Sequence, residues 1–146
     1  MIKVAICDDD IQFIYKLEQS IFRFAEMKRI KVDVDGYTSG AEFIQKLQQS
    51  ERYDLLFLDI ELGDSSGIIV GNWIRSQIQY ESMQIVFVSA KEMYAMQLFD
   101  LRPMNFLVKP IQQERVDYIL DEYERLYQFQ PHIIEIGKGR NSIRIE

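Results

Sequence analysis

The chain contains few of the residues that build disulfide-linked or zinc-bound proteins. Its 146 residues include one cysteine, Cys7, and one histidine, His132. A single cysteine cannot form a disulfide within the chain, and a single histidine cannot by itself supply a zinc site. With only three prolines and seven glycines, the composition also excludes collagen-like repeats and does not favour disorder. These absences indicate a protein of a reducing compartment.

Long apolar runs are also missing. No stretch approaches the roughly 18 apolar residues of a membrane span, and residues 1–7 are too short for the core of a signal peptide. We therefore expect a cytoplasmic protein without membrane contact. The 17 Lys and Arg residues against 23 Asp and Glu give a net charge of −6, which repels nucleic-acid phosphates weakly. Any DNA contact is therefore expected through a part of the protein outside this segment.

Short apolar segments alternate with segments of helical period along most of the chain. The expected strands cover residues 2–7, 31–37, 55–58, 85–88 and 106–108. Residues 31–37 alternate apolar and polar side chains, as an edge strand does, whereas the later strands are continuously apolar, as central parallel strands are. Ser39 and Glu42 form a capping box at one helix start. A further helix begins near Gly67 and is expected to direct Val70, Ile74 and Ile78 inward.

Five such βα units predict an α/β fold with a five-stranded, doubly wound parallel sheet, five helices and right-handed crossovers. These sheets bind ligands at the carboxyl ends of their strands. Four of the expected strands end in polar residues, which are Asp8 with Asp9, Asp59, Ser89 and Lys109. We therefore expect these side chains to share one crevice.

Three carboxylates in one partly buried crevice repel one another, each close pair by about 4 kcal/mol at 4 Å and an effective dielectric near 20. Lys109 offsets part of this repulsion, and a divalent cation with hard oxygen ligands, of which Mg²⁺ is the most suitable, offsets the rest. Asp59 would then be the nucleophile toward a phosphoryl group, with metal and lysine neutralising its charge. The Ser89 hydroxyl can donate a hydrogen bond to a phosphoryl oxygen.

Each of these residues also has a simpler explanation. Asp10 is expected only to cap the following helix, and capping explains Asp8 and Asp9 as well as metal binding does. A lone Ser89 or Lys109 at a strand end is usually part of a turn. The joint occurrence of acid, acid, hydroxyl and lysine at successive strand ends is much harder to obtain by chance.

Over residues 1–128 the sequence resembles the receiver domains of bacterial response regulators. The matching segments are Val4-Ala5-Ile6-Cys7-Asp8-Asp9, Leu58-Asp59-Ile60-Glu61-Leu62 with Gly67 eight residues after Asp59, Val88-Ser89-Ala90 and Phe106-Leu107-Val108-Lys109-Pro110. The resemblance implies a flavodoxin-like strand order 2-1-3-4-5. It also implies a protein that accepts a phosphoryl group from a sensor histidine kinase and catalyses only its own phosphorylation and dephosphorylation.

The resemblance assigns roles to the residues of the crevice. Asp59 is implied to be the phosphoacceptor, with Mg²⁺ bound directly by Asp9, Asp59 and the backbone carbonyl of Glu61, and through water by Asp8. Ser89 and Lys109 are implied to contact the phosphoryl group, with a cis peptide bond before Pro110. Ser89 and Phe106 occupy the switch positions. Because Phe106 lacks a hydroxyl, it can switch only by a change of rotamer, and core packing explains it equally well.

Outside these motifs the sequence supports fewer expectations. Gly63 stands where many receivers have proline, which is expected to loosen residues 63–66. Four apolar side chains are expected to pack helices three and four; they are Trp73, Met93, Met96 and Met104. Contact with partner proteins is a second role considered for part of this surface.

Residues 129–146 resemble a linker and the first strands of a truncated LytTR-type DNA-binding output domain. Two short apolar runs around residues 137–141 predict a hairpin with one isoleucine-rich side. Such a hairpin is marginal alone, so its isoleucines must dock on the receiver, pair with another copy or stay disordered. Of these we favour pairing, which would give a homodimer. DNA binding and transcription regulation are implied only through the missing remainder of that domain.

Other protein classes fit less well. Phosphatases of the haloacid dehalogenase type need a second aspartate two residues after the nucleophile, where this chain has Glu61, and a cap domain for which it has no room. A receiver-like interaction module that is never phosphorylated usually lacks one of the acidic or lysine positions, and none is missing here. Nucleotide binding on a Rossmann sheet needs a Gly-rich turn where Asp8-Asp9-Asp10 would repel a pyrophosphate.

Overall fold

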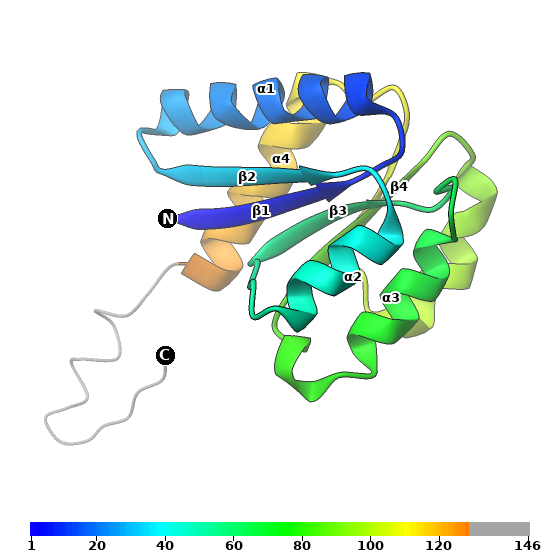
Figure 1. Ribbon diagram of the computed structural model, residues 1–146. Helices are drawn as coiled ribbons and strands as arrows, with labels where there is room; N and C mark the ends of the chain where they lie inside the picture. Colours follow the sequence, from blue (N-terminus) through cyan, green and yellow to red (C-terminus); the bar gives the residue numbers. More distant parts are fainter. Residues whose placement is uncertain (129–146) are drawn as a thin grey trace, which may run out of the picture.

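Five parallel strands form one sheet in the order β2-β1-β3-β4-β5, which confirms the predicted fold and strand order (Figure 1). The computed structural model describes residues 1–128, so the strand pair expected beyond residue 128 and the domain boundary at 129 lie outside the described residues. The strands are β1 (Ile2–Cys7), β2 (Val32–Tyr37), β3 (Leu55–Asp59), β4 (Gln84–Ser89) and β5 (Asn105–Val108).

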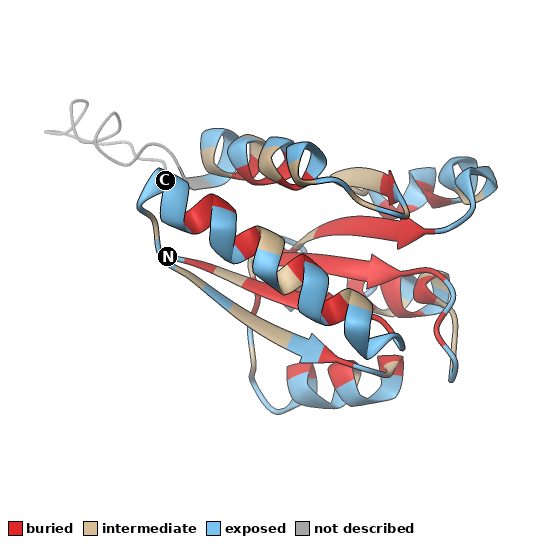
Figure 2. Cartoon of the chain, turned by 90° about the horizontal axis from the view of Figure 1, so that it is seen from above, coloured by how far each residue is buried: buried red, intermediate tan, exposed pale blue. Residues whose placement is uncertain are grey.

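The two faces of the sheet are covered by helices. One face carries α1 (Ile11–Lys28) and α4 (Gln113–Tyr123), which continues as the π-helix η3 (Glu124–Gln128). The other face carries α2 (Gly40–Gln48), α3 (Gly67–Arg75) and the 3₁₀-helix η2 (Glu92–Leu101) (Figure 1). All five residues of β3 are buried, and the three inner strands β1, β3 and β4 are the most buried part of the fold (Figure 2). The continuous apolar runs of β3 and β4 therefore mark central strands, whereas the similar run in β5 belongs to an edge strand in which only Leu107 is buried.

Side-chain caps hold the helix starts near the carboxyl ends of the strands. Asp10 caps α1 by accepting hydrogen bonds from the backbone N–H groups of Gln12 and Phe13. Ser39 caps α2 by accepting one from the N–H of Glu42. These bonds satisfy backbone donors that have no partner within a helix. Capping is thus the role of Asp10, as predicted.

Two predictions of buried side chains were wrong. Ile78 is 84% exposed, because α3 ends at Arg75 and Ile78 begins the separate short 3₁₀-helix η1 (Ile78–Tyr80). Met93 and Met96 are 71% and 86% exposed. The helix that carries them, η2, is wound with three residues per turn, so residues three apart lie on one face. The methionine face points to solvent, and the sheet side is covered by other residues of η2.

Of the other two residues expected to pack helices three and four, Trp73 packs on the core beneath them, whereas the prediction for Met104 was wrong because this residue packs on the opposite face of the sheet. Trp73 is partly buried and its ring lies 5.6 Å from the ring of Tyr80, and Met104 packs against the cluster beneath α1 and α4. Within residues 1–128, no helix has the length and apolar character needed to cross a membrane.

Candidate functional site

The polar residues predicted to share a crevice lie along one edge of the sheet. Asp8 follows β1, Asp59 and Ser89 are the last residues of β3 and β4, and Lys109 follows β5. Parallel strands end at the same edge, so their carboxyl ends meet there. The N–H of Lys109 donates a 2.8 Å hydrogen bond to the carbonyl of Ser89, which joins the ends of β4 and β5.

Three carboxylates come together at this edge. Asp8, Asp9 and Asp59 each offer one oxygen, and these oxygens all lie within 4.8 Å of one another. Asp8 and Asp59 are buried, with 1% and 4% of their surface exposed, whereas Asp9 faces solvent. Asp8 and Asp59, the buried pair, therefore repel each other as the sequence predicted.

Lys109 supplies a positive charge beside the two buried carboxylates. Its Nζ lies 2.9 Å from Oδ2 of Asp8 and 3.9 Å from Oδ2 of Asp59. The same Nζ lies 4.3 Å from the ring centroid of Phe13, on the first turn of α1. The peptide bond between Lys109 and Pro110 is cis, as the resemblance implied. In this arrangement the ammonium is closer to Asp8 than to Asp59.

The environment of Asp59 favours the protonated form of its carboxyl group. Burial, followed by the negative charge of Asp8, raises the pKa of Asp59 from 3.8 to about 6. Lys109 and a hydrogen bond of 3.4 Å from the backbone N–H of Glu61 to Oδ1 oppose this shift. Without a further cation, a substantial fraction of Asp59 carries a proton just below neutral pH.

The donor set fits a magnesium ion. Oδ1 of Asp8 accepts a 2.8 Å hydrogen bond from the N–H of Asp10, so Asp8 does shape the turn before α1. Its buried Oδ2 has the ion pair with Lys109 but no hydrogen bond among the residues described. A buried carboxylate oxygen without a hydrogen bond, next to two further carboxylates, is a hard ligand set of the kind Mg²⁺ takes. Asp9 is not the cap of α1, which removes the alternative explanation for that residue.

Gly67 brings the start of α3 against the end of β3. Its N–H donates a 2.7 Å hydrogen bond to the carbonyl of Ile60. A Cβ at this position would lie 2.2 Å from the carbonyl oxygen of Asp59 and 2.8 Å from Cα of Ile60. The backbone of α3 therefore packs directly on the end of β3, and Gly67 is required for this close approach.

The expected switch residues lie on β4 and β5. Ser89 is fully buried, and its Oγ accepts a 3.0 Å hydrogen bond from the N–H of Lys91. Phe106 is partly buried and packs on the core beneath α2, α3 and η2. The roles of both residues as switches, and of Ser89 toward a phosphoryl group, stay predictions.

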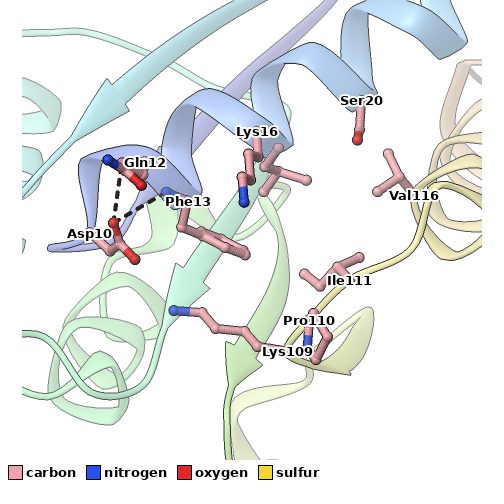
Figure 3. A pocket seen from close by; sticks show the side chains of 10 residues that line it. Asp10, Gln12, Phe13, Lys16, Ser20, Lys109, Pro110, Ile111 and Val116 are labelled. Atoms are coloured by element: carbon pink, nitrogen blue, oxygen red, sulfur yellow. Dashed lines mark hydrogen bonds between the residues drawn. The ribbon is translucent and has the colours of Figure 1, made fainter.

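Sequence reasoning missed two sets of neighbours of this site. Glu61 forms an ion pair of 3.1 Å with Lys91 and accepts a 3.2 Å hydrogen bond from the hydroxyl of Tyr94. Phe13 and Lys109 also line a cavity of about 420 Å³ between α1 and the segment after β5 (Figure 3). Neither set has a sequence signal, because the partners come from segments far apart in the chain.

Comparison with known proteins decides the family. Residues 4–121 match the response regulator receiver domain family. The chain belongs to this family. Its acidic crevice is therefore that of a receiver domain of a two-component response regulator, the family that the sequence resembles.

Two similar proteins show what kinds of regulator this receiver resembles. It is 30% identical over 131 residues to the sensory transduction protein LytT of Bacillus cereus, covering 89% of this chain and 50% of that protein. It thus spans about half the length of the curated relatives it matches. A two-component response regulator from Clostridium difficile has the same fold, with a TM-score of 0.73 and 24% identity over 88% of this chain and 100% of that one.

A third similar protein was solved with ligands. The response regulator TrrA of Thermotoga maritima, in complex with Mg²⁺ and BeF, has a TM-score of 0.68 and 23% identity, covering 84% of this chain and 98% of that one. At this level of identity the likeness concerns the fold of the receiver.

Proposed function

We propose that this receiver accepts a phosphoryl group on Asp59 from a sensor histidine kinase, with Mg²⁺ as cofactor. The observation that carries the proposal is the meeting of three carboxylates within 4.8 Å beside the ammonium of Lys109. The Mg²⁺ complex of the similar protein TrrA supports the same choice of metal. Asp9, Asp59 and the backbone carbonyl of Glu61 would hold the ion, and Asp8 would bind it through water.

The residues of the chain perform the transfer. A carboxylate oxygen of Asp59 attacks phosphorus, a new O–P bond forms, and the bond to the leaving group breaks with its electron pair going to that group. A bound Mg²⁺ supplies positive charge that neutralises the phosphoryl oxygens. The Lys109 ammonium lies 3.9 Å from Asp59 and contacts the transferred group, and Ser89 donates a hydrogen bond to it. Asp59 must be deprotonated to attack, so a cation that lowers its raised pKa favours the reaction.

Phosphorylation is proposed to act on an attached output domain. The chain spans half of a LytT sensory transduction protein, and residues 129–146 resemble the start of a LytTR-type DNA-binding domain. The receiver thus regulates transcription through that domain and catalyses only its own phosphorylation and dephosphorylation.

The experiment is incubation with acetyl phosphate or phosphoramidate and Mg²⁺, followed by intact-mass and peptide mass spectrometry. We expect one added phosphoryl group on Asp59, labile to base and hydroxylamine. Asp59→Asn abolishes it, whereas Asp100→Asn, at an exposed aspartate of η2, retains it. A label on Ser89, or unchanged labelling of Asp59→Asn, would remove Asp59 from its role.

A further inference from the structure

Phe13 lies next to Lys109, which belongs both to the acidic crevice and to the neighbouring cavity. Its side chain points from the first turn of α1 toward Lys109, and both residues line the cavity of about 420 Å³ (Figure 3). The backbone of Phe13 is held by the cap of α1, because its N–H donates a 3.3 Å hydrogen bond to Oδ1 of Asp10. The ring is therefore presented to Lys109 from a fixed turn of the helix.

On the proposed function, the ammonium of Lys109 would change partners when Asp59 is phosphorylated. It lies 2.9 Å from Asp8 and 3.9 Å from Asp59, so it has to turn from Asp8 toward the group on Asp59. Lysine carries its charge on a flexible stem of four carbons, and neither carboxylate holds the stem in place during that movement. In addition to the two carboxylates, the ammonium contacts the ring face of Phe13, whose centroid lies 4.3 Å from Nζ.

An aromatic ring at this position offers more than apolar cover. A ring face attracts a cation through its quadrupole as long as the cation stays within about 6 Å of the ring centroid. The Lys109 side chain is 24% exposed, so it has already lost much of its water, which strengthens such a contact. An aliphatic side chain of similar size would fill the space without attracting the charge.

We propose that Phe13 is a positioning residue for phosphorylation, which holds the Lys109 ammonium over the crevice by a cation–π contact as it turns from Asp8 to the phosphoryl group. The role rests on the proposed function, since it concerns the same transfer to Asp59. Phe13 itself contacts Lys109 and not the reacting atoms.

The test replaces Phe13 by phenylalanines with increasing fluorination, which weaken the quadrupole while keeping the shape of the ring. With phosphoramidate and Mg²⁺ we expect the phosphorylation rate to fall stepwise, by about three- to tenfold for the pentafluoro ring, with unchanged unfolding stability. Phe13→Leu is expected to lose a similar factor and Phe13→Tyr to keep the rate. The same fluorination at Phe22, a 39% exposed ring on the same helix, is the matched control and leaves the rate unchanged.

A second measurement does not depend on phosphorylation. Protons on the last carbons of Lys109 should show an upfield ring-current shift in the NMR spectrum of the wild type, and Phe13→Leu should lose it. Equal phosphorylation rates across the fluorinated series would overturn the positioning role while leaving Asp59 as acceptor. A wild-type protein that takes no label overturns the proposed function and this role with it, and the ring-current shift then reports only the contact.

Discussion

Opposed effects act on the pKa of the Asp59 carboxyl group: burial and the charge of Asp8 raise it, and Lys109 lowers it. Because its pKa is raised from 3.8 to about 6 in the folded chain, the folded state binds a proton more tightly than the unfolded state. The contribution of this group to stability is therefore present at pH below about 4 and is lost as the pH rises through about 6.

The raised pKa of Asp59 predicts how the stability of the metal-free protein depends on pH. The unfolding free energy of the wild type, relative to that of Asp59→Asn, should fall by about 2 to 3 kcal/mol between pH 4 and pH 7. Urea denaturation with EDTA at several pH values measures both proteins. A difference that does not change with pH would mean that Asp59 keeps an ordinary pKa.

Asp9 is the exposed member of the three carboxylates, and it tests the metal assignment. Asp9→Asn removes one charge from the cluster, so we expect it to leave metal-free stability unchanged or to raise it by on the order of 1 kcal/mol. Millimolar Mg²⁺ should stabilise the wild type but barely affect the variant. Thermal denaturation with and without Mg²⁺ measures both effects.

Asp10→Asn is the matched control for that change. It removes a charge from the neighbouring residue but keeps a side chain that caps α1 equally well, and its response to Mg²⁺ should equal that of the wild type. If Asp9→Asn destabilised the metal-free protein by more than about 1 kcal/mol, Asp9 would have a structural role and the metal assignment would weaken.

At the scale of elements, the joint between β3 and α3 has the tightest backbone contact near the site. A Cβ on Gly67 would lie 2.2 Å from the carbonyl oxygen of Asp59. We expect Gly67→Ala to destabilise the fold by about 3 kcal/mol and to slow phosphorylation by displacing the end of β3. Gly63→Ala is the control, because its Cβ would meet only the exposed Asp9 side chain, at 3.2 Å. Equal stability of the two variants in urea denaturation would contradict this account.

The helix η2 shows what sequence patterns leave open at this scale. Its existence and its end at Leu101 follow from the sequence, but the exposure of Met93 and Met96 does not. A winding of three residues per turn instead of 3.6 changes which side chains face the sheet. Ile78 was misplaced for a related reason, since the helical pattern continues past Arg75 although the helix does not.

For the whole molecule, the described residues already contain a sheet with helices on both faces (Figure 1). We expect removal of residues 129–146 to leave the folding transition and the phosphorylation of Asp59 unchanged, because residues 1–128 by themselves supply a hydrophobic core on each face of the sheet. Self-association should fall, since the isoleucine-rich segments predicted to pair with another copy are gone. Light scattering and denaturation of both lengths measure this. A shortened chain that does not fold would move the domain boundary at 129.

The sequence by itself determined the fold, the strand order expected for the family and the residues of the acidic crevice. Continuous apolar strands and polar strand ends recur at regular spacing, and parallel strands necessarily bring those ends together. The tertiary structure alone decided which carboxylates are buried, that Lys109 is closer to Asp8 than to Asp59, and that Phe13 covers its ammonium. These are contacts between segments far apart in the chain, and their distances depend on how helices pack on the sheet, which no local pattern records.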